Sequence, residues 1–227
     1  SDLAQLQHEW WQWVMAIPSS DSPVYDKTGN RCSIGQRGDV WFLAGSTGGK
    51  ITRTCTVPEG VTLLVPVVNN FCFPDAAYTD ERCTEETIQF IDDFDPAMIS
   101  LVVDSEPQDI ERVSDTDNFD FTVGYNGFGG VKPGVYRATV ADGYWGLVGP
   151  LAPGAYTVHI VAQGQNLGKK LLQPRPIVWV NLLPVRGFTG LEVCRVVTTD
   201  AIHLGRPVHV SAGGVVLPVP QVRDALR

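Results

Sequence analysis

The chain has 227 residues and a net charge of −8, with 44% hydrophobic and 19% charged residues, which excludes a disordered chain. Lysine and arginine do not cluster, so the attraction that drives binding to nucleic acid is missing. No apolar stretch approaches the roughly 20 residues that span a bilayer. We therefore expect a globular protein with neither a nucleic-acid partner nor a membrane span.

Residues 2–17 are predicted to form an amphipathic helix, because apolar residues recur at steps of three and four before Pro18. Trp10, Trp11 and Trp13 cannot all share one face of this helix, since successive residues are 100° apart. We favour packing of these rings in the core. The alternative is that at least one, Trp11 above all, is exposed and stacks on a ligand, joined by Tyr144 and Trp145 at a turn.

Short runs with strand character follow, separated by turn dipeptides such as Asn126-Gly127. They predict an all-β fold, a β-sandwich or jelly roll with the N-terminal helix and one short inserted helix. The inserted helix is expected to begin at Thr84 as N-cap and to present Ile88, Ile91 and Phe94 on one side. The strand candidates are residues 40–44, 50–57, 61–68, 98–104, 118–123, 145–148, 155–162 and 176–183.

The composition changes after Pro184, and residues 185–227 hold five arginines against three acidic residues. We therefore divide the chain into a β-sandwich domain, residues 1–184, and a strand-rich C-terminal extension, residues 185–227. Strand-like pieces of the extension lie at 192–198, 206–211 and 215–219. The extension either adds strands to the sandwich or pairs with another subunit to form a homo-oligomer.

Four of the five cysteines bracket short segments that bring their ends together, which favours the disulfides Cys32–Cys55 and Cys72–Cys83. Metal binding is the competing use, but C-x-x-C spacing is missing. Disulfides indicate an oxidising compartment, extracellular or periplasmic, and Cys194 is left unpaired. We expect any export signal to have been removed before Ser1.

The chain resembles a family of secreted, mostly bacterial and archaeal proteins to which no catalytic residues are assigned. The resemblance covers residues 8–184. The longest shared motifs are WWQW at residues 10–13, CSIGQRGDVWFLAG at 32–45, RTCTVPEG at 53–60 and ADGYW at 141–145. It implies a secreted β-sandwich. Many relatives have His where this chain has Tyr156, so a metal site built on a His-x-x-His pair with His159 is not expected here.

Candidate catalytic residues are few and lack a recognisable pattern. Asn69 and Asn70 end an apolar strand, and Asp142 and Tyr144 would lie near His159 if their segments pair. Such a group would surround a cleft in a hydrolase or lyase. A solitary strand histidine is more often a hydrogen-bonded structural residue, and buried amides are often satisfied by backbone, so we favour structural roles.

Two acidic clusters have the oxygen ligands that Ca²⁺ prefers. One comprises Asp92, Asp93 and Asp95, and the other Asp115, Asp117 and Asp120. The second lacks the glycine and the distal glutamate of an EF-hand, so a solvated acidic loop is favoured over a calcium site. No other cofactor is expected.

Three functional hypotheses follow. The first is a secreted, non-enzymatic module that binds a carbohydrate or small molecule, or assembles through its C-terminal extension. The second is a secreted hydrolase or lyase acting on a polysaccharide or a small extracellular metabolite. The third is a calcium-stabilised adhesion or matrix module.

Overall fold

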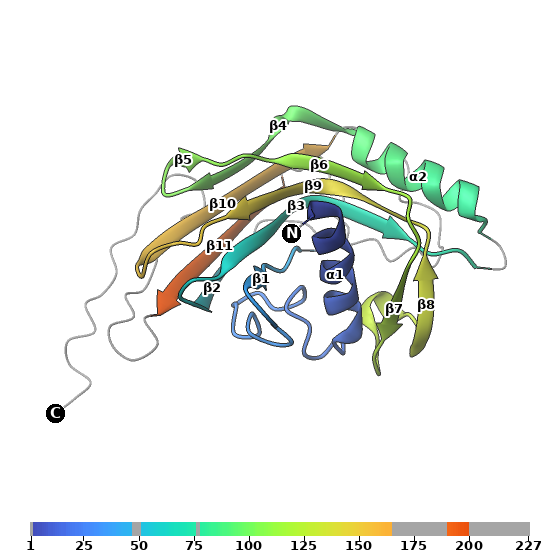
Figure 1. Cartoon of the computed structure of the whole chain (residues 1–227), viewed down its shortest axis with the longest axis horizontal. Helices are drawn as coiled ribbons and strands as arrows, with labels where there is room; N and C mark the ends of the chain where they lie inside the picture. The colour runs from blue at the N-terminus through green and yellow to red at the C-terminus, as the bar shows by residue number, and fades with distance from the viewer. Residues whose placement is uncertain (1, 47–50, 76–77, 165–189, 200–227) are drawn as a thin grey trace.

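The computed structural model describes residues 2–46, 51–75, 78–164 and the backbone of 190–199, and it confirms a predominantly β fold with two α-helices (Figure 1). Sheet A has the order β1 (Val40–Phe42), β3 (Thr62–Cys72), β9 (Val140–Val148) and β6 (Glu111–Asp115). Sheet B has the order β2 (Ile51–Pro58), β11 (Gly190–Thr199), β10 (Ala155–Gly164), β4 (Phe94–Val103) and β5 (Glu106–Pro107). A separate hairpin joins β7 (Phe119–Val123) to β8 (Gly134–Ala138).

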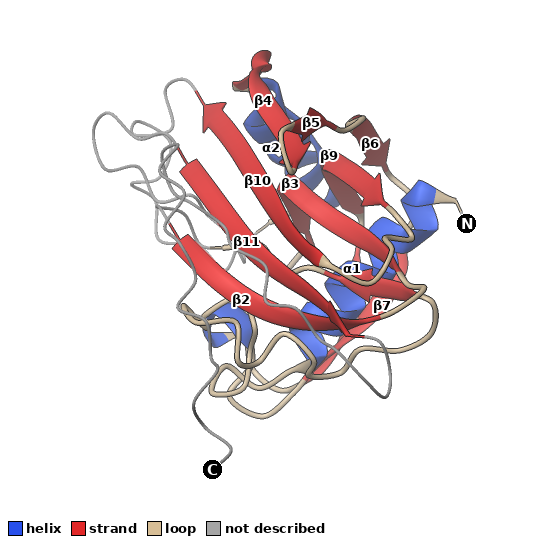
Figure 2. Ribbon diagram, turned by 90° about the vertical axis from the view of Figure 1, so that its left-hand side faces the viewer, coloured by secondary structure: helices blue, strands red, loops and turns tan. Residues whose placement is uncertain are grey.

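Sheet A lies between two apolar cores, which explains the uninterrupted apolar run of β3. On one face, Leu64, Phe71 and Trp145 pack against α1 (Leu3–Ala16). On the other, Leu63 and Val65 belong to the core shared with sheet B. A strand covered on both faces has no polar face to alternate with, so β3 reads Leu-Leu-Val-Pro-Val-Val rather than alternating. Figure 2 looks onto sheet B, with the other elements behind it.

Helix α1 begins where predicted, because the Asp2 side chain accepts a hydrogen bond from the Ala4 amide (3.1 Å) and caps the first turn. The two sheets arch over the helix and the β7–β8 hairpin stands beside it (Figure 1). Gln12 Nε2 donates to Asp120 O on the hairpin (2.8 Å). Sheet A therefore covers one face of α1, and the β7–β8 hairpin covers another.

The second helix, α2 (Asp80–Asp92), starts earlier than predicted. Its N-cap is Thr79, whose Oγ1 accepts from the Arg82 amide, with Asp80 and Glu81 in the first turn. The predicted cap at Thr84 is wrong, because the same pattern of a hydroxyl followed by two carboxylates occurs five residues upstream. Phe94 also lies outside the helix, at the start of β4.

Both predicted disulfides are present. Cys72–Cys83 joins the end of β3 to the first turn of α2, with 5.5 Å between the Cα atoms. Cys32–Cys55 joins the loop before β1 to β2, with a Cα separation of 5.9 Å. The pairs fix α2 and this loop to the sheets.

The loop between α1 and β1 is held by a buried arginine. Arg53 of β2 is 3% exposed, and its guanidinium donates to the carbonyls of Val24 (2.8 Å), Asp26 (2.6 Å) and Ala44 (2.9 Å). Gln36 donates to Cys32 O and Phe42 O and accepts from the Phe42 amide. The polar groups of Arg53 and Gln36 are therefore used in hydrogen bonds that hold the fold together.

The β2 edge of sheet B is covered by the same loop. The Thr54 amide donates to Thr28 O (2.9 Å), and a Cβ on Gly29, whose φ is +91°, would lie 2.2 Å from Thr54 O. Only glycine allows this approach.

Strand β11 lies between β2 and β10, parallel to the former and antiparallel to the latter, so part of the C-terminal extension adds a strand to the sandwich. The remaining predictions for the extension lie outside the described residues. These are the strands at 206–211 and 215–219 and the subunit contacts; the predicted strand at 176–183 also lies there. Of Cys194 only the backbone is described, so its predicted unpaired state stays a prediction.

Candidate functional site

The four tryptophans proposed for ligand stacking are buried, so packing in the core is correct and the exposed alternative is wrong. Trp10, Trp11 and Trp145 are 0% exposed and Trp13 is 7% exposed. Trp11 packs edge to face on Trp10 at 4.9 Å between ring centroids and stacks on Phe71 of β3 at 4.0 Å. Strand β3 therefore covers the ring of Trp11, a long-range contact that an isolated helix pattern does not reveal.

Three of these indoles are also satisfied as hydrogen-bond donors. Trp10 Nε1 donates to Leu43 O (2.8 Å) and Trp13 Nε1 to Ile34 O (2.9 Å). Trp145 Nε1 donates to Gln7 Oε1 (2.8 Å). Each ring therefore joins α1 to another part of the chain.

The five candidate catalytic residues do not all come together. Asp142 and Tyr144 alternate with Ala141 and Trp145 along β9, and these two neighbours face α1. Asp142 and Tyr144 therefore share the opposite face, on which Asn70 lies opposite Asp142 in the register. 

Asn69 lies on the α1 face instead, because a Cβ built on its partner Gly143 would approach Asn69 Cβ to 2.7 Å. His159 belongs to β10 in the other sheet, between Val158 and Ile160, whose side chains fill the core between the sheets. Its ring thus points away from that core. The structure brings Asn70, Asp142 and Tyr144 together, and leaves Asn69 and His159 elsewhere.

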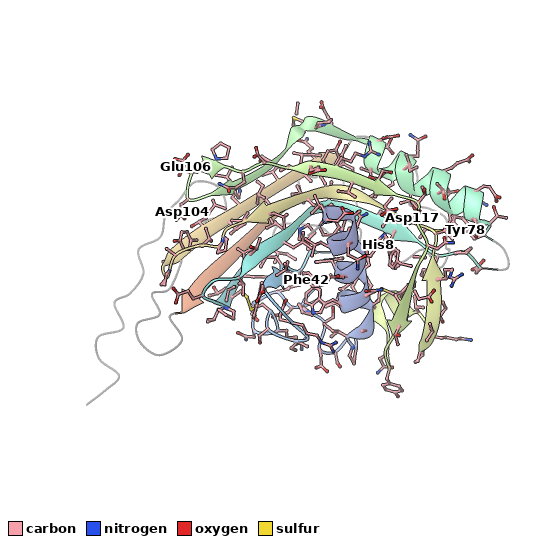
Figure 3. All side chains as sticks on the ribbon, viewed as in Figure 1. His8, Phe42, Tyr78, Asp104, Glu106 and Asp117 are labelled. Atoms are coloured by element: carbon pink, nitrogen blue, oxygen red, sulfur yellow. A yellow bond between two sulfur atoms is a disulfide. The ribbon has the colours of Figure 1, made fainter. Side chains whose placement is uncertain are left out.

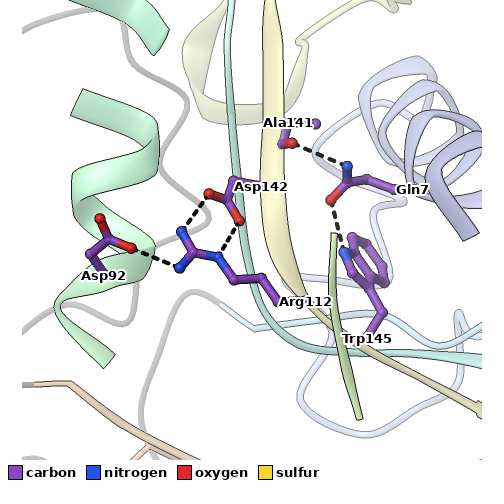
Figure 4. A network of polar contacts seen from close by, with 6 residues as sticks. All are labelled: Gln7, Asp92, Arg112, Ala141, Asp142 and Trp145. Carbon is purple, nitrogen blue, oxygen red and sulfur yellow. Dashed lines mark hydrogen bonds and ion pairs between the residues drawn. The ribbon is translucent and has the colours of Figure 1, made fainter. Parts of the chain in front are cut away.

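The polar cluster on the inner face of sheet A is an ion-pair network (Figure 4). Asp142 is 0% exposed and accepts from Arg112 Nε (3.0 Å) and Nη2 (2.8 Å). Arg112 Nη1 reaches Asp92 at the end of α2 (2.7 Å), and its guanidinium lies 5.9 Å from the centre of the Tyr144 ring. Burial raises the pKa of Asp142, opposed by the hydrogen bonds and charge of Arg112. The same hydrogen bonds raise the pKa of Arg112.

This network joins three elements of the fold. Arg112 comes from β6, Asp142 from β9 and Asp92 from α2, so one guanidinium connects two strands to a helix. Asn70 beside it is 1% exposed, and neither atom of its amide has a partner among the described residues. Both oxygens of the buried Asp142 carboxylate are thus engaged by Arg112, which favours a structural role for this ion pair.

The two described histidines with perturbed pKa values are separate. His8 lies on α1 (labelled in Figure 3). Its ring stacks on Phe119 at 4.1 Å, and its Nε2 lies 3.3 Å from Asp115 Oδ2. Burial lowers the pKa of His8, while the charges of Asp115, Asp117 and Asp2 oppose this. Burial alone lowers the pKa of His159, whose Nε2 has no partner among the described residues.

The acidic clusters are engaged in internal contacts. Asp95 accepts from the Ala97 amide, Asp115 from the Asp117 amide, and Asp120 pairs with Arg137 (3.0 Å). Within the described ranges, no three His, Cys, Asp or Glu side chains gather as metal ligands would. Neither described helix is long and apolar enough to cross a bilayer.

The structure adds a feature that sequence reasoning missed: an open hollow of about 370 Å³ in the loop between β7 and β8. Tyr125 lies on it and is 77% exposed, more than any other large hydrophobic side chain of the described residues. From the sequence, residues 125–127 are predicted only to form a turn. An aromatic residue directly before Asn-Gly was the signal available. The lining comprises Ser19, Tyr125, Asn126, Gly127, Gly130, Val131, Lys132 and Pro133.

The backbone of the hollow is fixed from several sides. The Ser19 amide donates to Asn126 O and its Oγ to Gly127 O, both at 2.9 Å. Tyr136 Oη donates to Lys132 O (2.9 Å). A Cβ on Gly127 would lie 2.0 Å from Val123 Cγ1, so only glycine fits there. The loop is thus ordered by contacts that leave the Tyr125, Asn126 and Lys132 side chains uncommitted among the described residues.

Comparisons with protein families, with curated proteins and with solved structures find no match.

Proposed function

We propose that this protein is a secreted, non-enzymatic module that binds a carbohydrate or another small molecule in the hollow beside Tyr125. The observation that carries the proposal is an aromatic ring 77% exposed on an open hollow whose backbone is held by hydrogen bonds. A volume of about 370 Å³ lies at the lower end of the range for small-molecule sites.

The ring supports a saccharide because tyrosine combines an apolar face with a polar hydroxyl, and the Asn126 amide beside it can both donate and accept. A fixed loop lowers the entropy cost of binding, since only side chains have to be ordered. Two disulfides support secretion into an oxidising compartment.

The hydrolase or lyase alternative has weaker support. Asp142 is bound on both oxygens by Arg112, and His159 belongs to the other sheet, so the candidates do not form an acid and base pair across a cleft. Binding without turnover is the function that the described side chains favour.

The experiment is a glycan array followed by isothermal titration calorimetry on the full chain. We expect at least one glycan to bind, and Tyr125→Ala to weaken binding at least tenfold without a change in melting temperature. Tyr125→Phe keeps the ring face and is expected to retain affinity within about threefold.

Val135→Ala is the matched control, because Val135 is 73% exposed and does not line the hollow. An array without any binder, or full affinity in Tyr125→Ala, would overturn the proposal. Hydrolysis of a bound glycan would instead support the enzyme alternative.

A further inference from the structure

The charge of the hollow differs from that of the protein. The chain carries −8, yet Lys132 is the one charged residue of the lining, and no carboxylate belongs to it. Salt at physiological strength screens charges beyond about 8 Å, so a molecule bound in the hollow would experience the charge of this lysine more than the net charge of the whole chain.

Lys132 differs from the arginines that form ion pairs. Arg82, Arg112 and Arg137 each contact a carboxylate within 3.0 Å. Lys132 has no such partner among the described residues, and only its carbonyl is engaged, by Tyr136 Oη. Its position in the loop is therefore fixed while its ammonium remains available to an anion.

The three uncommitted side chains belong to one loop and have complementary chemistry. Tyr125 offers a ring face, Asn126 an amide and Lys132 a point charge with three donors. Lys132 is exposed, so water solvates its ammonium when the hollow is empty. A carboxylate on the sugar would replace this water with a charge-assisted hydrogen bond that an uncharged sugar does not offer.

Resting on the proposed function, we propose that the hollow selects saccharides that carry a carboxylate, with Lys132 as the residue that recognises the acid. The sugar ring stacks on Tyr125 and its carboxylate binds the Lys132 ammonium. The ligand class is thus a uronic-acid oligosaccharide rather than a neutral glycan.

The test is calorimetric titration of the full chain with a galacturonic acid tetrasaccharide and with its methyl ester, which has the same rings without the charges. We expect the acid to bind about tenfold more tightly than the ester. Lys132→Gln should remove this preference and leave binding of the ester unchanged. Lys27→Gln, the same charge change at an exposed position outside the hollow, should preserve it.

The outcomes separate the inference from the proposed function. Equal affinity for acid and ester, or an equal loss in Lys27→Gln and Lys132→Gln, overturns the selection of acids. Binding that still depends on Tyr125 would then leave the proposed function standing. If neither saccharide binds, the inference fails, and the glycan array alone decides the function.

Discussion

Replacing Arg112 by methionine removes the partner of a fully buried carboxylate. Both oxygens of Asp142 accept from this guanidinium, at 3.0 and 2.8 Å, and the side chain of Asp142 is 0% exposed. Breaking a buried pair from one side typically costs about 3–5 kcal/mol. Protonating a carboxyl group with a pKa of about 3.9 costs about 4 kcal/mol at pH 7, which gives an upper limit of similar size. We expect a loss of about 3–4 kcal/mol.

The pH dependence of this loss has a defined sign. Without Arg112, burial raises the pKa of Asp142 further above its unfolded value, so the folded state binds the proton more tightly. Between the two pKa values the folded state holds more protons, and its stability falls as pH rises. The loss of unfolding free energy caused by Arg112→Met should therefore become smaller as the pH falls below 7, by about 1.4 kcal/mol per pH unit at most.

Urea unfolding followed by tryptophan fluorescence measures both effects, because Trp10, Trp11 and Trp145 are fully buried. Arg137→Met is the matched control. It breaks another cross-strand arginine–aspartate pair whose side chains are 66% and 59% exposed, and should cost at most about 1 kcal/mol. A loss below 1 kcal/mol for Arg112→Met at pH 7, or one that does not change with pH, would refute the role given to the buried carboxylate.

Three further predictions concern the core, the histidines and metal ions. Trp11→Ala should cost about 3–5 kcal/mol in urea unfolding because it empties a site stacked on Phe71, and a loss near zero would place the ring in solvent. Burial lowers the pKa of His8 and His159, so the unfolded chain binds more protons below about pH 6.5. The melting temperature should then fall between pH 7 and 5.5, and less so in a variant with both histidines changed to asparagine. Chelation by EDTA should leave the melting temperature unchanged, because Asp92 and Asp95 are bound internally, whereas a drop reversed by Ca²⁺ would favour the calcium hypothesis.

The elements with strong local signals were predictable from sequence. The tryptophan spacing and Pro18 predicted α1 nearly to the residue, and the cysteine spacing predicted both disulfides. Strand β9 was recognised only from Trp145 onward, although it starts at Val140. Asp and Gly are unfavourable in strands, and they are accommodated here by tertiary contacts: Arg112 binds Asp142, and Gly143 lies against Asn69.

The site was less predictable because it depends on which sheet each strand joins. Alternation alone could separate Asn69 from Asn70, but the register that sets Asn70 opposite Asp142 follows a bulge between Pro66 and Val68. The stacking of Trp11 on Phe71 of β3 is likewise a long-range property. The sequence indicated only that Tyr125 lies beside a turn. The exposure of its side chain depends on which elements pack around it in the folded chain.

The loop over β2 has a consequence for solubility. An eight-residue strand at the edge of a sheet is a template for pairing with other chains, and aggregation often begins at such an edge. Here the Thr54 amide is already bound by Thr28, and Gly29 presses on the Thr54 carbonyl. A side chain at position 29 would force the loop away from β2 and expose the Thr54 backbone for pairing with another strand.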